Sequence, residues 1–328
     1  MTVAFAYHRA TDMRDALTSG ALPGAAFIAG GTDLLQLWKA GLASPRTVVD
    51  LTTLPLDQTT DDGDDLVIGA LTRLDDLAAS PIVGGDYPLI SAAILASASR
   101  QIRTMASVGG NLLQRTRCPY FRGALPVCNK RDPGSGCGAR AGESRSAAIF
   151  GADLACAATH ASDLAVALAA LDACLDIRGA SGGRRLPITA LYRRPGDPPE
   201  LDTHLRPGEL ITAARVSSAR RLARRSTYLK IRDRASFEFA VVSVAAALEI
   251  VDGRIVDARL AAGGVAPGPW RLKAAEAALL GATPNETTFG AAAEAATAGA
   301  EPFGMASFKV ELLARSVLRA LQTIGKPA

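Results

Sequence analysis

The stretch AFIAGGTDLL (residues 26–35) joins a short apolar run to a helical one through two glycines. Its first four residues are typical of a strand, and residues 33–40 are typical of a helix. Glycines at such a junction let the backbone approach a ligand, and the first amides of the helix can bind an anion such as a pyrophosphate. The stretch matches neither G-x-G-x-x-G nor a Walker sequence, so it indicates neither a Rossmann nor a P-loop site. An ordinary strand-to-helix turn is the alternative.

A second Gly-Gly turn lies in QIRTMASVGGNLL (residues 101–113). It offers the hydroxyl of Ser107, two permissive glycines and the amide of Asn111, which tolerates a positive φ. Two such turns can clasp one dinucleotide from both sides. Two unrelated turns would fit the same pattern.

The rest of the first two thirds of the chain alternates short strands and helices, which predicts an α/β domain. Strand-like runs lie at 47–51, 66–70 and 173–177, helical ones at 73–79, 89–102 and 162–171, and an acidic stretch at 57–65 is predicted to be a solvated loop. A basic, loop-rich link near residue 217 indicates a domain boundary.

Beyond that link, Asp252-Gly253 separates two strand-like runs and predicts a two-residue hairpin. Helices follow, the last of them with an apolar face that includes Leu313, Val317 and Leu321. We therefore expect an α+β chain: an α/β domain over residues 1–217, then an α+β domain on an antiparallel sheet over residues 218–328.

Composition limits the function. The 328 residues are 48% hydrophobic and carry a net charge of +4, which excludes a disordered chain and is too small an excess to indicate nucleic-acid binding unless it is concentrated. There is no apolar run of about 18 residues, as a membrane span requires, and the first residues do not resemble a secretory signal. We expect the chain to fold in the cytoplasm, although a partner's signal can still export an assembled complex to the periplasm.

Positive charge is concentrated in a loop at residues 114–156, which has almost no hydrophobic periodicity. Between residues 115 and 145 its net charge is +5, more than that of the whole chain. Cys118, Cys128, Cys137 and Cys156 are separated by 9, 8 and 18 residues, whereas structural zinc sites use closely spaced cysteine pairs. Four thiolates around an anionic iron–sulfur cluster would explain both the cations and the length of the loop. Four unrelated reduced thiols in a mobile basic loop are the alternative.

The remaining candidates have simpler interpretations. Cys174 lies in an apolar strand and is expected in the core, and His160 is expected to be a hydrogen-bonded structural residue rather than a ligand. The sequence contains no nucleophile elbow, zincin motif or Ser/His/Asp constellation.

Taken together, IAGGTDLL (28–35), QIRTMASVGGNLL (101–113) and the following SDLA (162–165) resemble the flavoprotein chain of the xanthine dehydrogenase and carbon monoxide dehydrogenase family of molybdenum hydroxylases. The resemblance extends over essentially the whole chain. It implies a two-part FAD-binding domain of the vanillyl-alcohol-oxidase/PCMH type, followed by a C-terminal domain of the carbon monoxide dehydrogenase flavoprotein type. The cysteine loop is similar to the [4Fe-4S]-containing variant found in periplasmic aldehyde oxidoreductases and, with a different loop, in 4-hydroxybenzoyl-CoA reductases.

Carried over residue by residue, the resemblance implies two ligand sets. The FAD-binding residues would be Ile28, Ala29, Gly30, Gly31, Thr32, Asp33, Leu34, Ser107, Gly110, Asn111, Asp163, Ile211 and Lys230. The ligands of the [4Fe-4S] cluster would be Cys118, Cys128, Cys137 and Cys156. Asp163 and Lys230 would tune the flavin rather than the fold. Ser97 stands where xanthine dehydrogenases have an aromatic residue beside the flavin, and this departure counts against nicotinamide binding.

The resemblance implies an electron-transfer subunit with no catalytic acid or base of its own. Its partners would be a small [2Fe-2S] subunit and a large subunit with the molybdenum cofactor, in a heterotrimeric aldehyde oxidoreductase that passes electrons through FAD to an external acceptor. The alternatives within the family are a subunit of a CoA-thioester reductase or of xanthine dehydrogenase. A non-catalytic nucleic-acid-binding protein is the alternative from a different class.

Overall fold

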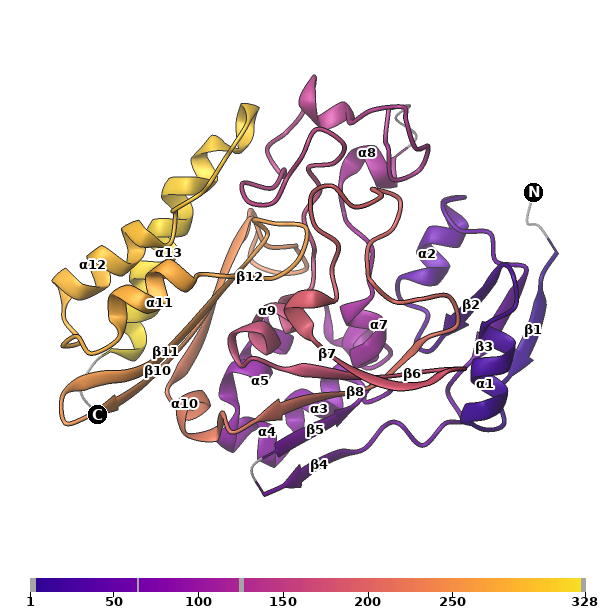
Figure 1. Cartoon of the computed structure of the whole chain (residues 1–328), viewed down its shortest axis with the longest axis horizontal. Coiled ribbons are helices and arrows are strands. Elements are labelled where there is room, and N and C mark those ends of the chain that lie inside the picture. Colours follow the sequence, from indigo (N-terminus) through magenta and orange to yellow (C-terminus); the bar gives the residue numbers. More distant parts are fainter. Residues whose placement is uncertain (1–3, 64, 124–126, 326–328) are drawn as a thin grey trace.

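A computed structural model describes residues 4–63, 65–123 and 127–325 (Figure 1). The chain begins with a three-stranded parallel sheet in the order β1-β3-β2. Its strands are β1 (Ala6–Arg9), β2 (Ala25–Ile28) and β3 (Thr47–Asp50), and its helices are α1 (Met13–Gly20) and α2 (Leu34–Lys39). Parallel neighbours need a helical crossover, which α1 and α2 supply. The first Gly-Gly turn therefore lies at the carboxyl end of β2.

The second sheet is antiparallel, with five strands in the order β4-β5-β8-β6-β7. The strands are β4 (Thr59–Asp62), β5 (Asp65–Gly69), β6 (Cys174–Gly179), β7 (Gly182–Pro187) and β8 (Leu210–Ser217). The prediction of a solvated loop over 57–65 was wrong where β4 forms, because Thr59–Asp62 pairs with β5 as an edge strand. Its exposed side chains gave no alternating apolar pattern that would have indicated a strand.

Helices pack beside this sheet. The first four lead to the second Gly-Gly turn, which lies in α7, and the others follow it. They are α3 (Leu74–Ala79), α4 (Pro81–Asp86), α5 (Pro88–Leu95), α6 (Arg100–Arg103), α7 (Val108–Leu112), α9 (Asp163–Ala170), η2 (Ile188–Ala190) and α10 (Arg220–Arg224). The single helix predicted over 89–102 was wrong. Ala98 has a φ of +47°, which interrupts the helix, and Ser99 caps α6 by accepting a hydrogen bond from Ile102 N at 3.3 Å.

The C-terminal third contains a four-stranded antiparallel sheet in the order β12-β11-β10-β9. Its elements are β9 (Ser226–Ile231), β10 (Val242–Val251), β11 (Arg254–Gly263), β12 (Trp270–Arg271), α11 (Lys273–Leu279), α12 (Glu286–Ala295), η3 (Gly304–Ser307) and α13 (Phe308–Ile324). The predicted hairpin is confirmed, since Asp252 and Gly253 both have the positive φ of a type I′ turn, +49° and +72°.

The cysteine loop lies at the top of the molecule as seen in Figure 1, between α2 and the upper end of the C-terminal sheet. Within its described residues it forms only α8 (Pro119–Arg122) and η1 (Gly138–Arg140). Its last part, with Ala147, Ile149 and Phe150, belongs to the core of the C-terminal sheet, while α9 packs on the opposite side of β10 and β11. Packing thus extends across the boundary predicted near residue 217, which stays a prediction.

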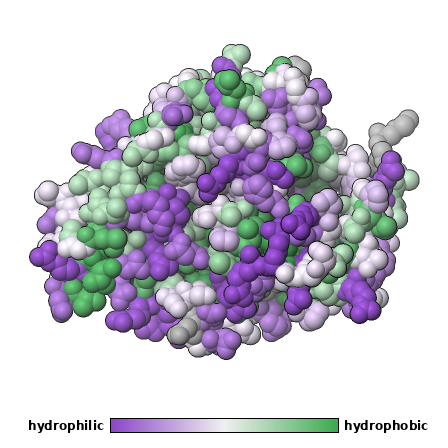
Figure 2. Space-filling view, viewed as in Figure 1, coloured by the Kyte–Doolittle hydropathy of each residue, from purple (hydrophilic) through white to green (hydrophobic). Residues whose placement is uncertain are grey.

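Polar and apolar side chains are interspersed over the face seen in Figure 2. Within the described ranges of the chain, no helix is both long and apolar enough to cross a bilayer.

One buried carboxylate organises the C-terminal sheet. Glu276 on α11 is 6% exposed and accepts hydrogen bonds from Leu260 N and from Arg271 Nε, both at 2.8 Å. Arg271 also pairs with Asp172, which follows α9, so the same network joins the sheet to the first two thirds of the chain.

Replacing Glu276 with Ala should lower the free energy of unfolding of this region by about 3–5 kcal/mol, because it removes the buried carboxylate partner of Arg271, leaving only the more exposed Asp172, and leaves Leu260 N without its acceptor. Denaturant unfolding followed by the fluorescence of Trp270 would measure the change, in a Trp38→Phe background that removes the chain's other tryptophan. Glu294→Ala, at an exposed position of α12, is the matched control and should change stability by less than about 0.5 kcal/mol. Equal stabilities of the two variants would contradict the role of Glu276.

Candidate functional site

Both Gly-Gly turns line one cavity of about 230 Å³. Residues 28–34 line it from the first turn, Ser107 and Gly110 line it from the second, and Ile211 on β8 lines it from the five-stranded sheet. Arg115 and Glu209 line it as well, although no motif in the sequence indicates them. The structure therefore places together ten of the thirteen predicted FAD residues, which come from three distant segments.

The two turns touch through their backbones. A Cβ atom on Gly30 would lie 1.7 Å from the carbonyl oxygen of Met105, so only glycine allows this approach. Gly31 has a φ of +69°, a left-handed conformation that also favours glycine. Both glycines of the first turn are thus required by the geometry, and the amides beyond them border the cavity.

The second turn is fixed by hydrogen bonds to the five-stranded sheet and by its own cap. Gly109 N donates to the carbonyl of Ala70 at 2.8 Å, and Ser107 Oγ accepts from Gly110 N at 3.3 Å at the start of α7. Asn111 is not among the described residues that line the cavity; its Oδ1 accepts a hydrogen bond from Ser162 Oγ at 2.6 Å. Asn111 therefore connects the second turn to the start of α9.

Asp33 borders the cavity, but its carboxylate is turned to the cysteine loop. It accepts hydrogen bonds from Arg122 Nη2 at 2.8 Å and Arg115 N at 2.9 Å, and it pairs with Arg117 Nη2 at 2.8 Å. An unpaired carboxylate would repel a pyrophosphate at this turn. The two guanidinium groups neutralise that charge, which makes the turn compatible with an anionic ligand.

Asp163 and Lys230 form a buried pair at the junction of α9 and β9. Lys230 Nζ donates to Asp163 Oδ2 at 2.8 Å, and the two side chains are only 3% and 5% exposed. Tyr228 Oη donates to Asp163 Oδ1 at 2.6 Å, and Lys230 Nζ also reaches the carbonyl of Ala96 at 3.1 Å. Removing one partner would leave a buried charge unpaired, so this pair also supports the fold, beyond the tuning role expected of it.

Asp163 lines a second cavity of about 350 Å³, which also contacts the cysteine loop at Arg117 and Cys118. The Asn111–Ser162 hydrogen bond and Arg117 lie between the two cavities, since Arg117 pairs with Asp33 of the first. Arg117 therefore connects the residues that line the two cavities.

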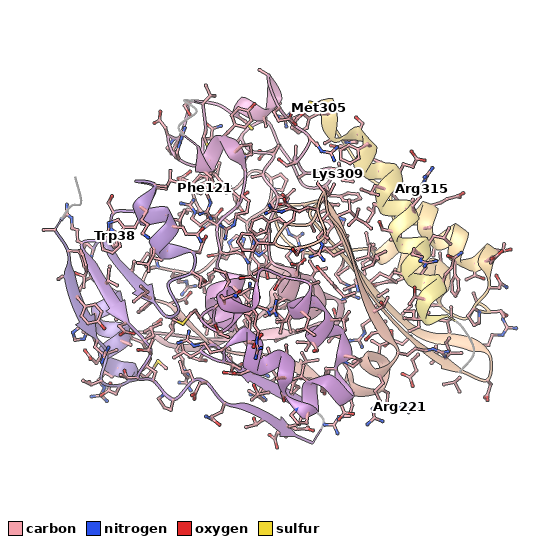
Figure 3. All side chains as sticks on the ribbon, turned by 180° about the vertical axis from the view of Figure 1, so that it is seen from behind. Trp38, Phe121, Arg221, Met305, Lys309 and Arg315 are labelled. Carbon is pink, nitrogen blue, oxygen red and sulfur yellow. The ribbon has the colours of Figure 1, made fainter. Side chains whose placement is uncertain are left out.

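Two buried nitrogen groups border this second cavity. Lys309, labelled at the start of α13 in Figure 3, donates to the carbonyls of Ala147 at 3.0 Å and Gly264 at 2.9 Å. Burial, assisted by the charge of Arg145, lowers the pKa of Lys309 to about 8. Burial likewise lowers the pKa of His160 to about 4, so its imidazole is neutral. Nε2 of His160 has no hydrogen-bond partner within the described part of the chain, contrary to the expected hydrogen-bonded histidine.

The four cysteines of the loop are free thiols that lie near one another. Cys128 and Cys137 face each other in an antiparallel bridge, and Cys118 precedes α8. Burial raises the pKa of Cys118 and raises that of Cys156 to about 11. Neighbouring thiols add to both shifts: Cys128 and Cys137 act on Cys118, and Cys137 and Cys118 act on Cys156. Cys174 is half-buried in β6, in a separate part of the fold.

Hydrogen bonds within the loop hold this arrangement. Asn129 Nδ2 donates to the carbonyl of Ala155 at 2.8 Å, while its Oδ1 accepts from Gly134 N at 3.0 Å and Gly136 N at 2.8 Å. Asn129 thus ties the turn between Cys128 and Cys137 to the segment that precedes Cys156. Across residues 4–63, 65–123 and 127–325, no three His, Cys, Asp or Glu side chains are grouped closely enough to hold a single metal ion.

Lys130 and Arg115 meet at one carboxylate, that of Asp202. Lys130 Nζ donates to Asp202 Oδ1 at 2.7 Å, and Arg115 Nε binds its other oxygen. Burial opposes the ionisation of Asp202, but the two cations outweigh it and hold the pKa of this carboxyl below its ordinary value. The cations on both sides of Cys118, and Lys130 between Cys128 and Cys137, are therefore paired with carboxylates of the chain. These cations are Arg115, Arg117 and Arg122 beside Cys118, and the carboxylates are those of Asp33 and Asp202.

Residues 3–217 match the family model "FAD binding domain in molybdopterin dehydrogenase", and residues 227–324 match "CO dehydrogenase flavoprotein C-terminal domain". The chain is 48% identical over 280 residues to the aldehyde oxidoreductase FAD-binding subunit PaoB of Escherichia coli, covering 84% of this chain and 86% of that protein.

Two more distant relatives agree. The glyceraldehyde dehydrogenase medium chain of Sulfolobus acidocaldarius is 27% identical over 288 residues, which are 86% of this chain and 83% of that protein. The structure of carbon monoxide dehydrogenase from Hydrogenophaga pseudoflava superposes with a TM-score of 0.76 at 26% identity, covering 99% of this chain and 98% of that one. The chain therefore belongs to the FAD-binding medium subunits of the molybdenum hydroxylase family, a family of oxidoreductases.

Proposed function

We propose that this chain is the FAD- and [4Fe-4S]-carrying electron-transfer subunit of a molybdenum-cofactor aldehyde oxidoreductase. The observation that carries the proposal is the meeting of both Gly-Gly turns on one cavity. Their backbone amides and the neutralised Asp33 suit the pyrophosphate of FAD. The 48% identity to an aldehyde oxidoreductase subunit favours this substrate class, while a xanthine dehydrogenase FAD-binding subunit of Escherichia coli is 26% identical.

In this proposal FAD is held by the turn residues 28–34, Ser107, Gly110 and Ile211, with Asp163 and Lys230 toward the flavin. When bound, the flavin supplies the conversion between one-electron and two-electron transfer. The chain's own residues bind and orient it: the glycines admit the phosphates, and the buried Lys230–Asp163 pair supplies a fixed charge distribution. The partners are a small [2Fe-2S] subunit and a large molybdenum-cofactor subunit, and the electrons leave to an external acceptor.

For the cluster, the proposed ligands are Cys118, Cys128, Cys137 and Cys156. The charges of these thiols influence one another, as expected of neighbouring ligands of one cluster. Metal binding would deprotonate the thiols. The charge of Lys130, which opposes the burial that raises the pKa of Cys156, would offset the negative charge of the cluster.

Nucleic-acid binding by the same loop is less well supported. Arg115, Arg117, Arg122 and Lys130 are paired with Asp33 or Asp202, and none of these four side chains is more than 25% exposed. Cations that are turned inward to carboxylates are not available to phosphates of a nucleic acid.

Gly110→Val tests the cavity. Gly110 lies in a helical conformation, and a Cβ there would be 3.1 Å from Ser107 Oγ, so the variant should fold but should crowd the ligand. Isothermal titration with FAD should show a Kd raised at least about tenfold, or about 1.4 kcal/mol of binding free energy. The control is Gly84→Val on α4, where the new side chain meets open space. Unchanged FAD affinity in Gly110→Val would remove the second turn from the site.

Single Cys→Ser changes at positions 118, 128, 137 and 156 should each lower the iron content of the anaerobically purified chain from about four irons. They should also expose the loop to protease, because the cross-link is lost. Cys174→Ser is the control, since it removes a thiol from β6 without touching the loop, and it should keep full iron. Zinc in place of iron, or full iron in Cys128→Ser, would contradict the cluster assignment.

Lys230→Met should lower the reduction potential of the bound flavin, since it leaves the Asp163 carboxylate uncompensated beside it. It should also lower stability by about 3–5 kcal/mol, as expected when one partner of a buried pair is lost. Lys230→Arg should restore most of both properties, and Lys39→Met, at an exposed lysine that ends α2, should change neither. A flavin potential that Lys230→Met leaves unmoved would place Lys230 outside the site.

A further inference from the structure

We propose that Asp33 and Asp202 are positioning residues that couple the FAD turn to the cysteine loop, so that each cofactor strengthens the binding of the other. This inference rests on the proposed function, because it takes the two sites as the FAD and cluster sites. It goes beyond that function by assigning a thermodynamic link between them and the residues that carry it.

Asp33 is the first connection. It belongs to the Gly-Gly turn and lines the first cavity, and its carboxylate binds three donors from the segment around Cys118. Arg117 directly precedes Cys118. Arg122 is the last residue of the short helix α8, and Cys118 is the N-cap of that helix. The Asp33 side chain is 14% exposed, so these pairs are sheltered from solvent and are stronger than surface ion pairs.

Asp202 is the second connection. It bridges Arg115, which lines the first cavity, and Lys130, which lies between Cys128 and Cys137. Lys130 Nζ also donates to the carbonyl of Pro199 at 2.8 Å, so the lysine is fixed at two points. Through this carboxylate, a residue of the FAD cavity and a residue of the cysteine turn share one partner.

An apolar contact reinforces the two ionic ones. Leu37 on α2 forms a small core with Phe121 and Cys128, and Cys118 packs against it. The guanidinium of Arg115 lies 4.5 Å from the centroid of the Phe121 ring. The helix that begins at the FAD turn is therefore packed directly on two of the four predicted cluster ligands.

These contacts make the link reciprocal. Over its described residues, 114–123 and 127–156, the cysteine loop has little helix and no long strand, so its conformation depends on such tertiary contacts. A ligand that orders the turn and Arg115 also orders the positions of Cys118 and Cys128, and a cluster that fixes those cysteines orders the turn in return. If the cluster raises the affinity for FAD by a given factor, FAD must raise the affinity for the cluster by the same factor.

The experiment measures FAD affinity of the complete complex with its cluster intact and after anaerobic removal of iron by a chelator. In the wild type, removal of the cluster should raise the Kd for FAD by about 5- to 150-fold, the range of typical coupling free energies. In Asp33→Asn and in Asp202→Asn this ratio should fall toward one. The rate at which the chelator extracts iron, with and without FAD, is the second readout and should lose its FAD dependence in the same variants.

Asp75→Asn is the matched control. Asp75 also binds two arginines, Arg100 at 3.2 Å and Arg103 at 3.3 Å, and at 18% exposure it is about as buried as Asp33, but it contacts neither site. It should keep the wild-type ratio.

Equal FAD affinity of the wild type with and without its cluster would overturn the coupling, and this measurement needs no variant to fold. A wild-type ratio retained in both Asp33→Asn and Asp202→Asn would overturn the role of the two carboxylates. A wild-type complex whose FAD-binding subunit holds no iron, or one that holds no flavin, would instead refute the proposed function itself, so the two failures are distinguishable.

Discussion

The contact between the backbone of Gly30 and the carbonyl of Met105 is the constraint on which the site depends. It brings a turn of the parallel sheet against a turn of the helical layer, at a distance that any side chain at residue 30 would forbid. Arg73 adds a hydrogen bond to the same carbonyl. Because these turns lie in different substructures, a single cavity with amides from both of them exists only as long as this contact holds.

Around that contact the charges are arranged to suit an anion. The turn carries an acidic residue, Asp33, where a pyrophosphate would bind, and the structure turns its carboxylate to Arg117 and Arg122. The same arginines belong to the loop that contains the four cysteines. The positive charge of the loop therefore acts within the chain: Arg117 and Arg122 neutralise Asp33 at the first cavity, and Lys130 acts on Cys156, one of the thiols proposed to hold an anionic cluster.

Much of this arrangement could be predicted from local patterns. The Gly-Gly turns, the hairpin at Asp252-Gly253 and the C-terminal helix depend on short-range preferences, and the structure has all of them. The edge strand β4 could not be predicted, because its exposed acidic residues form a strand only by pairing with β5. The break at Ala98 gave no glycine or proline signal either.

Ten of the residues that line the first cavity were singled out from the sequence, but their contacts were not. No local pattern indicates that Asp33 binds arginines more than 80 positions away, that Arg115 and Glu209 line the cavity, or that Asn111 binds Ser162. These contacts depend on how the separate segments pack, which short-range preferences do not determine. The buried Asp163–Lys230 pair is of the same kind, since its partners come from α9 and β9.

The most direct test of the account is a crystal structure of the anaerobically purified complex, with anomalous scattering recorded at the iron edge. The account predicts density for the FAD pyrophosphate between Gly31 and Gly110, and one compact iron peak enclosed by Cys118, Cys128, Cys137 and Cys156. Flavin density away from both Gly-Gly turns, or four cysteines without iron between them, would contradict it.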